Sequence, residues 1–267
     1  MNDKLAKIIT HVRAQRPLIQ AITNYVTIND CANALLSFGA SPAMCEASEE
    51  VEEFAGVANA VYLNIGTLIT EQREAMVKAA RIASFKGTPI VLDPVAAGGI
   101  SGKTDYARVL LEKQKISIVK GNSGEIKALA GFAGNVRGVD SADDGENIIE
   151  ACKELANKYE TVAVATGETD TISDGTRVVQ IQHGHPLLTR VTGTGCMLGA
   201  VAAATAAVEG DFFLAAASAV LAFNLASEIA AGHGIDMGPG TFRVRLMDSM
   251  HYITEQDIIN AGKVTWL

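Results

Sequence analysis

The segment with the clearest chemical potential covers residues 190–200 (RVTGTGCMLGA). Gly193 and Gly195 directly precede an Ala-rich helical pattern, so the backbone can curl and aim several N–H groups, with the positive end of the helix dipole, at one point. Cys196 falls in the first turn of that helix, where the dipole favours the thiolate form of a cysteine. A glycine pair also fits a plain turn, and cysteines are often buried and inert. Because the two features coincide, we favour an anion site beside a potential base or nucleophile.

Two acids follow predicted strands, where doubly wound sheets place ligand sites. Asp93 comes after a short apolar run, and Glu125 lies within residues 120–126 (KGNSGEI). Carboxylate oxygens suit Mg²⁺, which at nucleotide sites takes one or two carboxylates together with phosphate oxygens. Taken singly, Asp93 also fits a turn residue before Pro94, and Glu125 fits an acid that complements its own helix dipole. Together they predict a shared magnesium site.

Lys120 and Thr166 end neighbouring predicted strands and face the same crevice. Lys120 follows residues 116–119 and could reach a nucleotide phosphate as a point charge. Thr166 and Gly167 supply a hydroxyl and a glycine turn at the next strand end. A solvated lysine and an ordinary turn are the plain alternatives. His183 and His185 alternate along a strand, but without a third ligand they make no convincing zinc site.

The elements that must position these residues alternate between short apolar runs and helical patterns. Helix 28–38 closes at Gly39, an acidic helix follows Ser48, and Thr70 can cap a helix that ends at Gly87. Strands are predicted over residues 18–22, 41–44, 60–64, 89–93, 116–119 and 161–165. This order predicts an α/β fold with a mostly parallel central sheet and helices on both faces. Asp174 and Gly175 separate two β-rich runs and predict a small antiparallel hairpin.

The two ends of the chain are predicted to be helical. A first amphipathic helix precedes Pro17, and the pattern after Gly195 is helical to about Gly232, with a break near Gly210 and a further helix over residues 239–253. Without a linker or charge block, residues 1–267 are interpreted as a single domain. The apolar run over residues 212–226 is shorter than the roughly 20 residues of a membrane-spanning helix, so we expect a buried helix there.

Composition excludes several classes of protein. With 267 residues, 48% of them hydrophobic and 19% charged, the chain can form a large core, and a net charge of -8 gives nucleic acid no electrostatic attraction. Its four cysteines form no C-x-x-C pair and the N-terminus has no signal peptide, so we expect reduced thiols and a cytoplasmic location. The motifs of Rossmann dehydrogenases, P-loop NTPases and serine hydrolases are missing from the sequence.

Over nearly its whole length the chain resembles the hydroxyethylthiazole kinases, a family of the ribokinase-like superfamily. The G-T-G-C element belongs to the wider superfamily, since hydroxymethylpyrimidine kinases carry a similar one, whereas Asn24 and residues 41–44 are more particular to the thiazole enzymes. The resemblance is carried by residues 20–33 (QAITNYVTINDCAN), 39–44 (GASPAM), 92–98 (LDPVAAG), 120–126 (KGNSGEI), 165–167 (ATG) and 191–197 (VTGTGCM).

This resemblance implies a ribokinase-like fold and transfer of the γ-phosphoryl group of ATP to the primary alcohol of 4-methyl-5-(2-hydroxyethyl)thiazole, in thiamine synthesis or salvage. It also implies a homotrimer with active sites between subunits. Many relatives carry Arg where this chain has Lys120. The implied roles are thiazole binding for Met44, Gly193 and Asn24, ATP binding for Lys120 and Thr166, the catalytic base for Cys196, and Mg²⁺ binding for Asp93 and Glu125.

Three other functions fit parts of the pattern. A related ribokinase-like kinase could act on hydroxymethylpyrimidine or pyridoxal with the same phosphate machinery. A cysteine-nucleophile hydrolase would pair Cys196 with a histidine, although the sequence places none beside it. A non-catalytic sensor of nucleotide or a thiamine precursor is the third, because a fold alone does not fix an activity.

Overall fold

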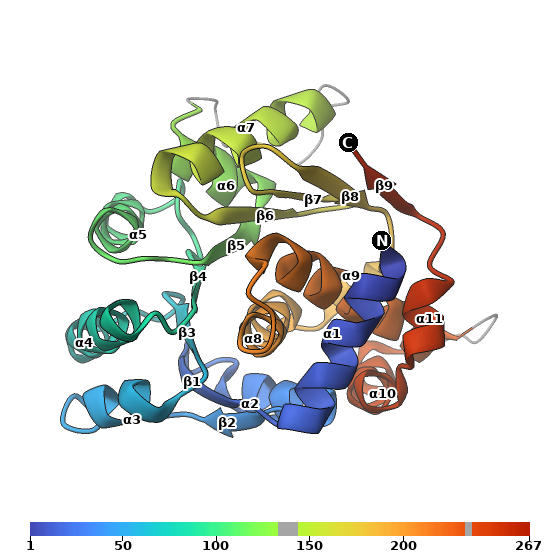
Figure 1. Ribbon diagram of the computed structural model, residues 1–267, viewed down its shortest axis with the longest axis horizontal. Coiled ribbons are helices and arrows are strands. Elements are labelled where there is room, and N and C mark those ends of the chain that lie inside the picture. The colour runs from blue at the N-terminus through green and yellow to red at the C-terminus, as the bar shows by residue number, and fades with distance from the viewer. Residues whose placement is uncertain (133–143, 233–236) are drawn as a thin grey trace.

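The computed structural model describes residues 1–132, 144–232 and 237–267, whose strands form one nine-stranded sheet in the order β2-β1-β3-β4-β5-β6-β7-β8-β9 (Figure 1). The pairs from β2 to β6 are parallel, and those from β6 to β9 are antiparallel. The strands are β1 (Leu18–Ile22), β2 (Ser41–Ala43), β3 (Ala60–Asn64), β4 (Ile90–Asp93), β5 (Ile118–Asn122), β6 (Val162–Thr166), β7 (Asp170–Ser173), β8 (Val178–Ile181) and β9 (Val264–Trp266).

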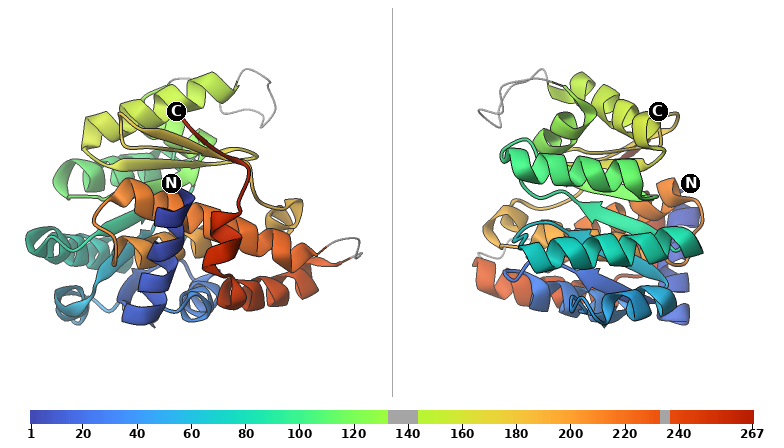
Figure 2. Two further views of the ribbon diagram at one scale, coloured as in Figure 1. Left: turned by 45° about the vertical axis from the view of Figure 1, so that its right-hand side comes forward. Right: turned by 90° about the vertical axis from the view of Figure 1, so that its left-hand side faces the viewer.

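Helices cover both faces of this sheet (Figures 1 and 2). One layer consists of α3 (Val51–Val57), α4 (Thr70–Lys86), α5 (Ser101–Lys113), α6 (Ser123–Ala130) and α7 (Asp144–Tyr159). The other consists of α1 (Asn2–Gln15), α2 (Ile28–Phe38), α8 (Thr194–Ala206), α9 (Phe212–Ala231), α10 (Pro239–Tyr252) and α11 (Glu255–Ile259), with the 3₁₀ turn η1 (Pro186–Arg190) before α8. The predicted α/β architecture is confirmed, including its antiparallel part.

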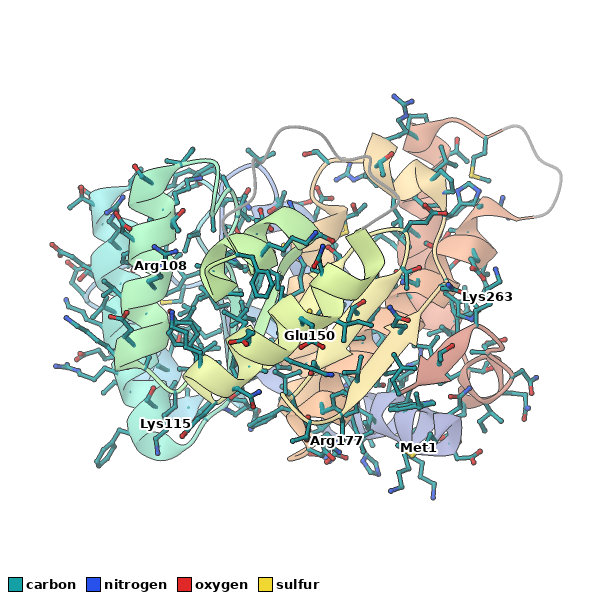
Figure 3. The ribbon with its side chains drawn as sticks, turned by 90° about the horizontal axis from the view of Figure 1, so that it is seen from above. Met1, Arg108, Lys115, Glu150, Arg177 and Lys263 are labelled. Atoms are coloured by element: carbon teal, nitrogen blue, oxygen red, sulfur yellow. The ribbon has the colours of Figure 1, made fainter. Side chains whose placement is uncertain are left out.

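Each face of the sheet has its own hydrophobic core, because successive side chains of a strand point to opposite sides. In β4, Val91 packs into the core under α8 and α9, while Ile90 and Leu92 pack into the core under α4 and α5. Charged side chains lie on the outside of the helical layers, as Glu150 on α7 and Lys115 after α5 show (Figure 3). Burial on both faces explains why the parallel strands have continuous apolar sequences.

Helix α8 lies unusually close to the sheet at one glycine. A Cβ atom added at Gly199 would lie 2.7 Å from the ring and hydroxyl of Tyr62 on β3. Every residue of α8 from Met197 to Ala206 is buried, and half of them are alanines. Small side chains therefore allow the helix backbone to approach the strands, which sets the position of its N-terminus.

Strand β5 begins and ends later than its apolar run indicates. A strand over residues 116–119 is predicted, with Lys120 at its end, whereas β5 continues to Asn122. Its parallel pairing with β6 extends through Lys120 opposite Val164 to Asn122 opposite Thr166. Because this ladder satisfies backbone groups whatever the side chains are, polar residues can continue the strand. Lys120 is therefore an internal, buried strand residue and not a solvated strand end.

Three other differences concern single elements. Thr70 is the first residue of α4 and not its cap, since Ile69 occupies the N-cap position without a side-chain hydrogen bond. Strand β9 was not expected from the sequence, because three partly exposed residues have no clear pattern. The Asp174–Gly175 hairpin is confirmed: Asp174 Oδ1 accepts hydrogen bonds from the N–H groups of Thr176 and Arg177, and Gly175 has φ +95°.

Helix α9 is longer than the run over residues 212–226 that predicts it. It has 20 residues and is long and apolar enough to cross a membrane, so the argument from insufficient length was wrong. Most of the helix is buried between the sheet and α1, α8 and α10. Ser218 of α9 also donates a hydrogen bond to the carbonyl of Leu5 in α1. The observed burial is what a core helix shows.

Candidate active site

The polar ends of the parallel strands meet at one edge of the sheet, beside the N-terminus of α8. Asn64 and Asp93 are paired opposite each other at the ends of β3 and β4. Lys120 Nζ on β5 donates to Asp93 Oδ2 at 3.1 Å and to the carbonyl of Gly195 at 3.0 Å. The strand ends and the glycine-rich segment, distant in sequence, therefore form one cluster.

Cys196 is the chemically distinctive cysteine of the cluster. Its side chain is partly exposed, whereas the other three cysteines are buried. Burial raises the pKa of both Cys31 and Cys152 to about 12, which keeps these two thiols protonated. Cys31 and Cys152 are therefore core residues, and Cys196 is the partly exposed sulfur.

Two asparagine amides donate hydrogen bonds to the Cys196 sulfur. Asn24 Nδ2 lies 3.3 Å and Asn64 Nδ2 lies 3.2 Å from Sγ. The amides are themselves connected, because Asn24 Nδ2 also donates to Asn64 Oδ1 at 2.9 Å. An amide nitrogen only donates, so both contacts place the sulfur in the acceptor role. This arrangement suits a sulfur that is to receive a proton.

Gly193 forms the N-cap of α8 in a left-handed conformation, with φ +85°. A Cβ atom there would lie 2.5 Å from Thr27 Cγ2, so both the backbone angle and the space require glycine. The first N–H groups of a helix have no acceptor within it, and the helix dipole favours an anion beside them. Residues 193–196 therefore open a helix whose first N–H groups are suited to an anion, and the anion site remains a prediction.

Asp93 and Lys120 form a buried ion pair. Their side chains are only 1% and 6% exposed. Burial disfavours the charged lysine, but the charges of Asp93 and Glu125 outweigh it and raise the pKa of Lys120. Asp93 Oδ2 also accepts hydrogen bonds from Tyr62 and Asn64, whereas the buried Oδ1 has no hydrogen-bond partner among the described residues.

Glu125 caps its own helix. Its Oε2 accepts from the N–H of Asn122 in a capping box, and its Oε1 accepts from the N–H of Ala96 in the loop after β4. Burial and the charge of Asp93 raise the pKa of Glu125. Within the described residues no third His, Cys, Asp or Glu joins Glu125 and Asp93 to form a larger ligand group. Each carboxylate oxygen of Glu125 keeps further acceptor capacity.

A cleft of about 690 Å³ adjoins this cluster. Thr166 and Gly167 line one wall, and Gly195 lines another. The Thr166 hydroxyl donates to the carbonyl of Gly121, which links β6 to β5. Further lining residues are Glu168, Asp170, Gln182, His183, Gly184, His185, Pro186, Leu188, Thr189, Thr194, Leu198, Phe223 and Asn224.

The cluster contains most of the predicted site residues and several that the sequence did not single out. Met44 is partly buried and packs against the core on the α8 side. Asn64 was missed, although it ends the apolar strand AVYLN in the same way that Asp93 ends its own strand. Tyr62 and Asp170 were also missed, because nothing in their local sequence announces their partners.

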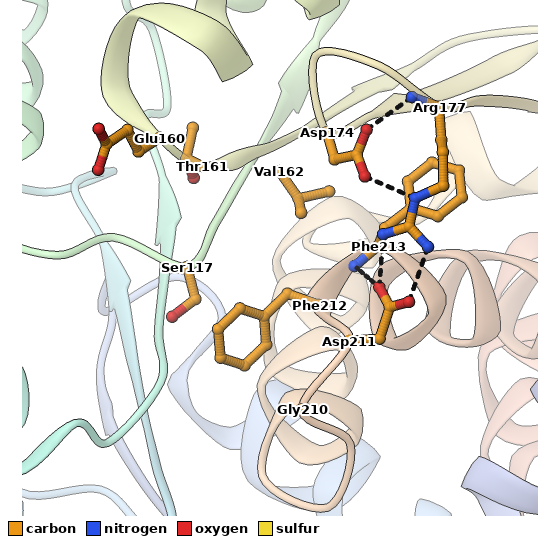
Figure 4. A pocket seen from close by; sticks show the side chains of 10 residues that line it. All are labelled: Ser117, Glu160, Thr161, Val162, Asp174, Arg177, Gly210, Asp211, Phe212 and Phe213. Atoms are coloured by element: carbon orange, nitrogen blue, oxygen red, sulfur yellow. Dashed lines mark hydrogen bonds and ion pairs between the residues drawn. The ribbon is translucent and has the colours of Figure 1, made fainter.

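A second pocket, of about 400 Å³, lies at the opposite ends of β5 and β6 (Figure 4). Arg177 lines this pocket, and its guanidinium group donates two hydrogen bonds to the carboxylate of Asp211, at 2.7 and 2.8 Å, and one to Asp174 Oδ2 at 2.6 Å. Arg177 also covers the ring of Phe213, 4.4 Å from the centroid. These contacts join the hairpin to the start of α9 and use the charge of Arg177 internally. None of the predicted site residues lines this pocket.

Comparison with solved structures places the fold among the ribokinase-like kinases. The pyridoxal kinase from Staphylococcus aureus, solved with pyridoxal, superposes with a TM-score of 0.59 at 18% identity, covering 83% of this chain and 89% of that one. The hydroxyethylthiazole kinase from Pyrococcus horikoshii superposes with a TM-score of 0.90 at 40% identity, covering 98% of both chains.

Sequence comparison gives the family. The model of the hydroxyethylthiazole kinase family matches residues 9–256. Hydroxyethylthiazole kinase 1 of Clostridium botulinum is 48% identical over 263 residues, which are 98% of this chain and 99% of the relative. Hydroxyethylthiazole kinase of Desulfitobacterium hafniense is 47% identical over the full length of both chains. The chain belongs to the hydroxyethylthiazole kinase family.

Proposed function

We propose that this protein transfers the γ-phosphoryl group of ATP to the primary hydroxyl of 4-methyl-5-(2-hydroxyethyl)thiazole, giving the thiazole phosphate used in thiamine synthesis or salvage. Family membership supports the reaction. The observation that carries it is the position of Cys196: a partly exposed sulfur at the start of α8, contacted by two amide donors and adjacent to the Lys120–Asp93 pair.

The proposed chemistry requires positioning and charge stabilisation more than covalent catalysis. The alcohol oxygen attacks the γ-phosphorus, the bond to the ADP oxygen breaks, and the alcohol proton passes to the Cys196 sulfur, which acts as a thiolate in this step and becomes a thiol. The N–H groups at residues 193–196 and the buried ammonium of Lys120 stabilise the charge on the migrating phosphoryl group. Asn24 and Asn64 keep the sulfur oriented as the proton acceptor.

Asp93 and Glu125 fit a magnesium site. Asp93 Oδ1 is a buried acceptor without a partner in the described chain, and Glu125 adds a second carboxylate at the same edge of the sheet. Oxygen donors of this kind are the ligands that Mg²⁺ prefers. When bound, Mg²⁺ would neutralise negative charge on the phosphates of ATP. Asp93 would keep its other oxygen on Lys120.

The substrates are assigned to the two sides of the cluster. We place ATP in the cleft that Thr166 and Gly167 line, with Lys120 near its phosphates. The thiazole alcohol is placed near Asn24, Gly193 and Met44, so that its hydroxyl reaches Cys196. The partial exposure of Cys196 supports this placement, because the reacting sulfur must be accessible from outside the core.

A homotrimer with active sites between subunits, in the cytoplasm, is part of the proposal. Tyr25 and Val26, next to the site residue Asn24, are 52% and 62% exposed, which is unusual for large apolar side chains at a site. Sedimentation should give a trimer that Val26→Asp dissociates and Val57→Asp, at the equally exposed end of α3, does not. A stable, active wild-type monomer contradicts this assembly.

ATP consumption with three alcohols tests the function. With Mg²⁺ present, kcat/KM should be highest for the thiazole alcohol and much lower for hydroxymethylpyrimidine and pyridoxal. Faster turnover of either competitor would reassign the kinase, and no turnover with any of them would favour a sensor. A cysteine hydrolase is disfavoured by the contacts of Cys196, whose described hydrogen-bond partners are Asn24 and Asn64 and not a histidine.

A further inference from the structure

Asp170 is a buried acid for which the proposed reaction has no use. It is 4% exposed, begins β7 after the turn that contains Gly167, and lines the cleft of about 690 Å³. Its Oδ1 accepts a hydrogen bond from the N–H of Gly167 at 2.9 Å. Its Oδ2 accepts one from Asn224 Nδ2 at 2.5 Å. Each oxygen therefore connects to a different wall of the cleft.

Asn224 belongs to the most apolar helix of the chain. Helix α9 is mostly Ala, Leu, Phe and Val, yet Asn224 is only 4% exposed within it. One turn later, Glu228 accepts from the N–H of Gly184 at 3.1 Å and contacts His183 Nδ1 at 3.1 Å. Two polar side chains one turn apart on α9 thus bind Asp170, at the start of β7, and the segment after β8, and both border the cleft. Burying such groups is unfavourable unless they are hydrogen-bonded, which these are.

We propose that Asp170, held by Asn224, is a positioning residue for the nucleotide: it fixes the Thr166–Gly167 turn in the conformation that contacts ATP. The inference rests on the proposed function only in placing ATP in this cleft. Asp170 acts through the backbone of Gly167 and through α9, and it touches neither the alcohol nor Cys196. Its loss should therefore weaken ATP binding while leaving the transfer step intact.

Asp170 accepts two hydrogen bonds although its burial disfavours the charged carboxylate. Burial raises the pKa of Asp170 to about 6, against the opposing effect of the hydrogen bonds from Gly167 and Asn224 and of the charge on Lys120. The other ionisable groups that line the cleft are Glu168, His183 and His185, with Glu228 behind His183. A neutral asparagine retains an acceptor oxygen for Gly167, so the geometry, and not the charge, is expected to matter most.

Steady-state kinetics separate positioning from a merely structural role. Asp170→Ala should raise the KM for ATP about tenfold, as expected for the loss of one ordering hydrogen bond, while kcat and the KM for the thiazole alcohol change by less than about twofold. Asp170→Asn should restore a near-wild-type KM, because its amide oxygen can accept from Gly167 and Asn224 can turn to present its own oxygen. Ser218→Ala removes a buried hydrogen bond of α9 far from the cleft and serves as the matched control.

The inference is overturned if Asp170→Ala keeps the wild-type KM for ATP, or if it lowers kcat alone. Should Asp170→Ala fail to fold, Asn224→Ala leaves the acid in place and should raise the KM for ATP by about threefold. An unchanged KM in that variant counts equally against the role. Calorimetric titration with ADP measures nucleotide binding to the same cleft without turnover. A wild-type protein that binds ADP but has no kinase activity would therefore contradict the proposed reaction and not this inference.

Discussion

Asn64 and Asp93 occupy paired positions at the ends of adjacent parallel strands, and Asn64 Nδ2 donates to Asp93 Oδ2 at 3.0 Å while lying 3.2 Å from Cys196 Sγ. One amide therefore contacts both the proposed base and the proposed metal-binding acid. Its Oδ1 accepts from Asn24 and from the N–H of Gly66, so all its polar atoms are engaged. Asn64 thus connects the proposed base to the proposed metal-binding acid.

Replacement of Cys196 tests the base. Cys196→Ala should lower kcat by about 10²–10⁴-fold, the usual contribution of a general base, whereas Cys196→Asp should keep substantial activity because a carboxylate can accept the same proton. Both are measured by ATP consumption with saturating thiazole alcohol. Near-wild-type kcat in both variants would remove the proton-accepting role from Cys196.

Replacement of Asn64 tests the orientation of that base. Asn64→Ala removes the donor to Sγ and to Asp93, so we expect kcat to fall by about 10- to 100-fold with a smaller change in the KM for ATP. Asn64→Asp should be worse, since it places a second carboxylate against Asp93. Asn260→Ala, an exposed asparagine after α11, is the control. An equal kcat for Asn64→Ala and the control would argue against a role for Asn64 in orienting Cys196.

A methyl group at Gly121 should disturb magnesium binding. A Cβ atom there would lie 2.9 Å from Glu125 Oε2, so Gly121→Ala must displace the carboxylate. We expect the Mg²⁺ concentration for half-maximal activity to rise several-fold. Gly102 is an exposed residue of α5, and a Cβ atom added there would meet no other atom within 4 Å. Gly102→Ala should therefore leave that Mg²⁺ concentration unchanged and stabilise the fold by about 0.5–1 kcal/mol. A normal Mg²⁺ requirement in Gly121→Ala would contradict the assignment of Glu125.

Asp170 should make the free energy of unfolding fall as pH rises. Its pKa is raised from 3.8 to about 6 in the folded protein, so folding favours the protonated form. That stabilisation is complete below pH 3.8 and is lost as pH rises through about 6, amounting to at most ~3 kcal/mol. Urea unfolding between pH 4 and 7 should show Asp170→Asn gaining on the wild type as pH rises. If the free energy of unfolding depends on pH in the same way for both proteins, the pKa of Asp170 is not raised.

Much of the fold could be predicted because the parallel strands are buried on both faces and have continuous apolar sequences. Leu18–Ile22 and Ala60–Asn64 form strands at their predicted bounds, and the Asp174–Gly175 turn forms the predicted hairpin. Strand β9 could not be predicted, because Val264–Trp266 is extended only through pairing with β8, which is distant in sequence. The true extent of β5 likewise depends on its neighbour β6.

Several residues of the described cluster could be named from the sequence, whereas their contacts could not. The glycines before α8 and the acids after buried strands have local signatures, so Cys196, Asp93 and Glu125 could be named in advance. Which partners they take depends on register and helix packing. The ion pair of Lys120, the hydrogen bond from the Ala96 N–H to Glu125 and the two amides on Cys196 are all contacts between elements far apart in the chain.

The close approach of α8 to β3 has a consequence for the response of the enzyme to ionic strength. Gly199 rests against Tyr62, whose hydroxyl bonds Asp93, so the spacing between the helix start and the acid is set by steric contact. Burial raises the pKa of Tyr62 well above its usual value, which keeps that hydroxyl a donor even in alkaline solution. Salt screens exposed charges far more than buried ones. A high salt concentration should therefore leave the internal geometry of the reaction centre intact. Its main effect should be on the rate at which the enzyme binds ATP.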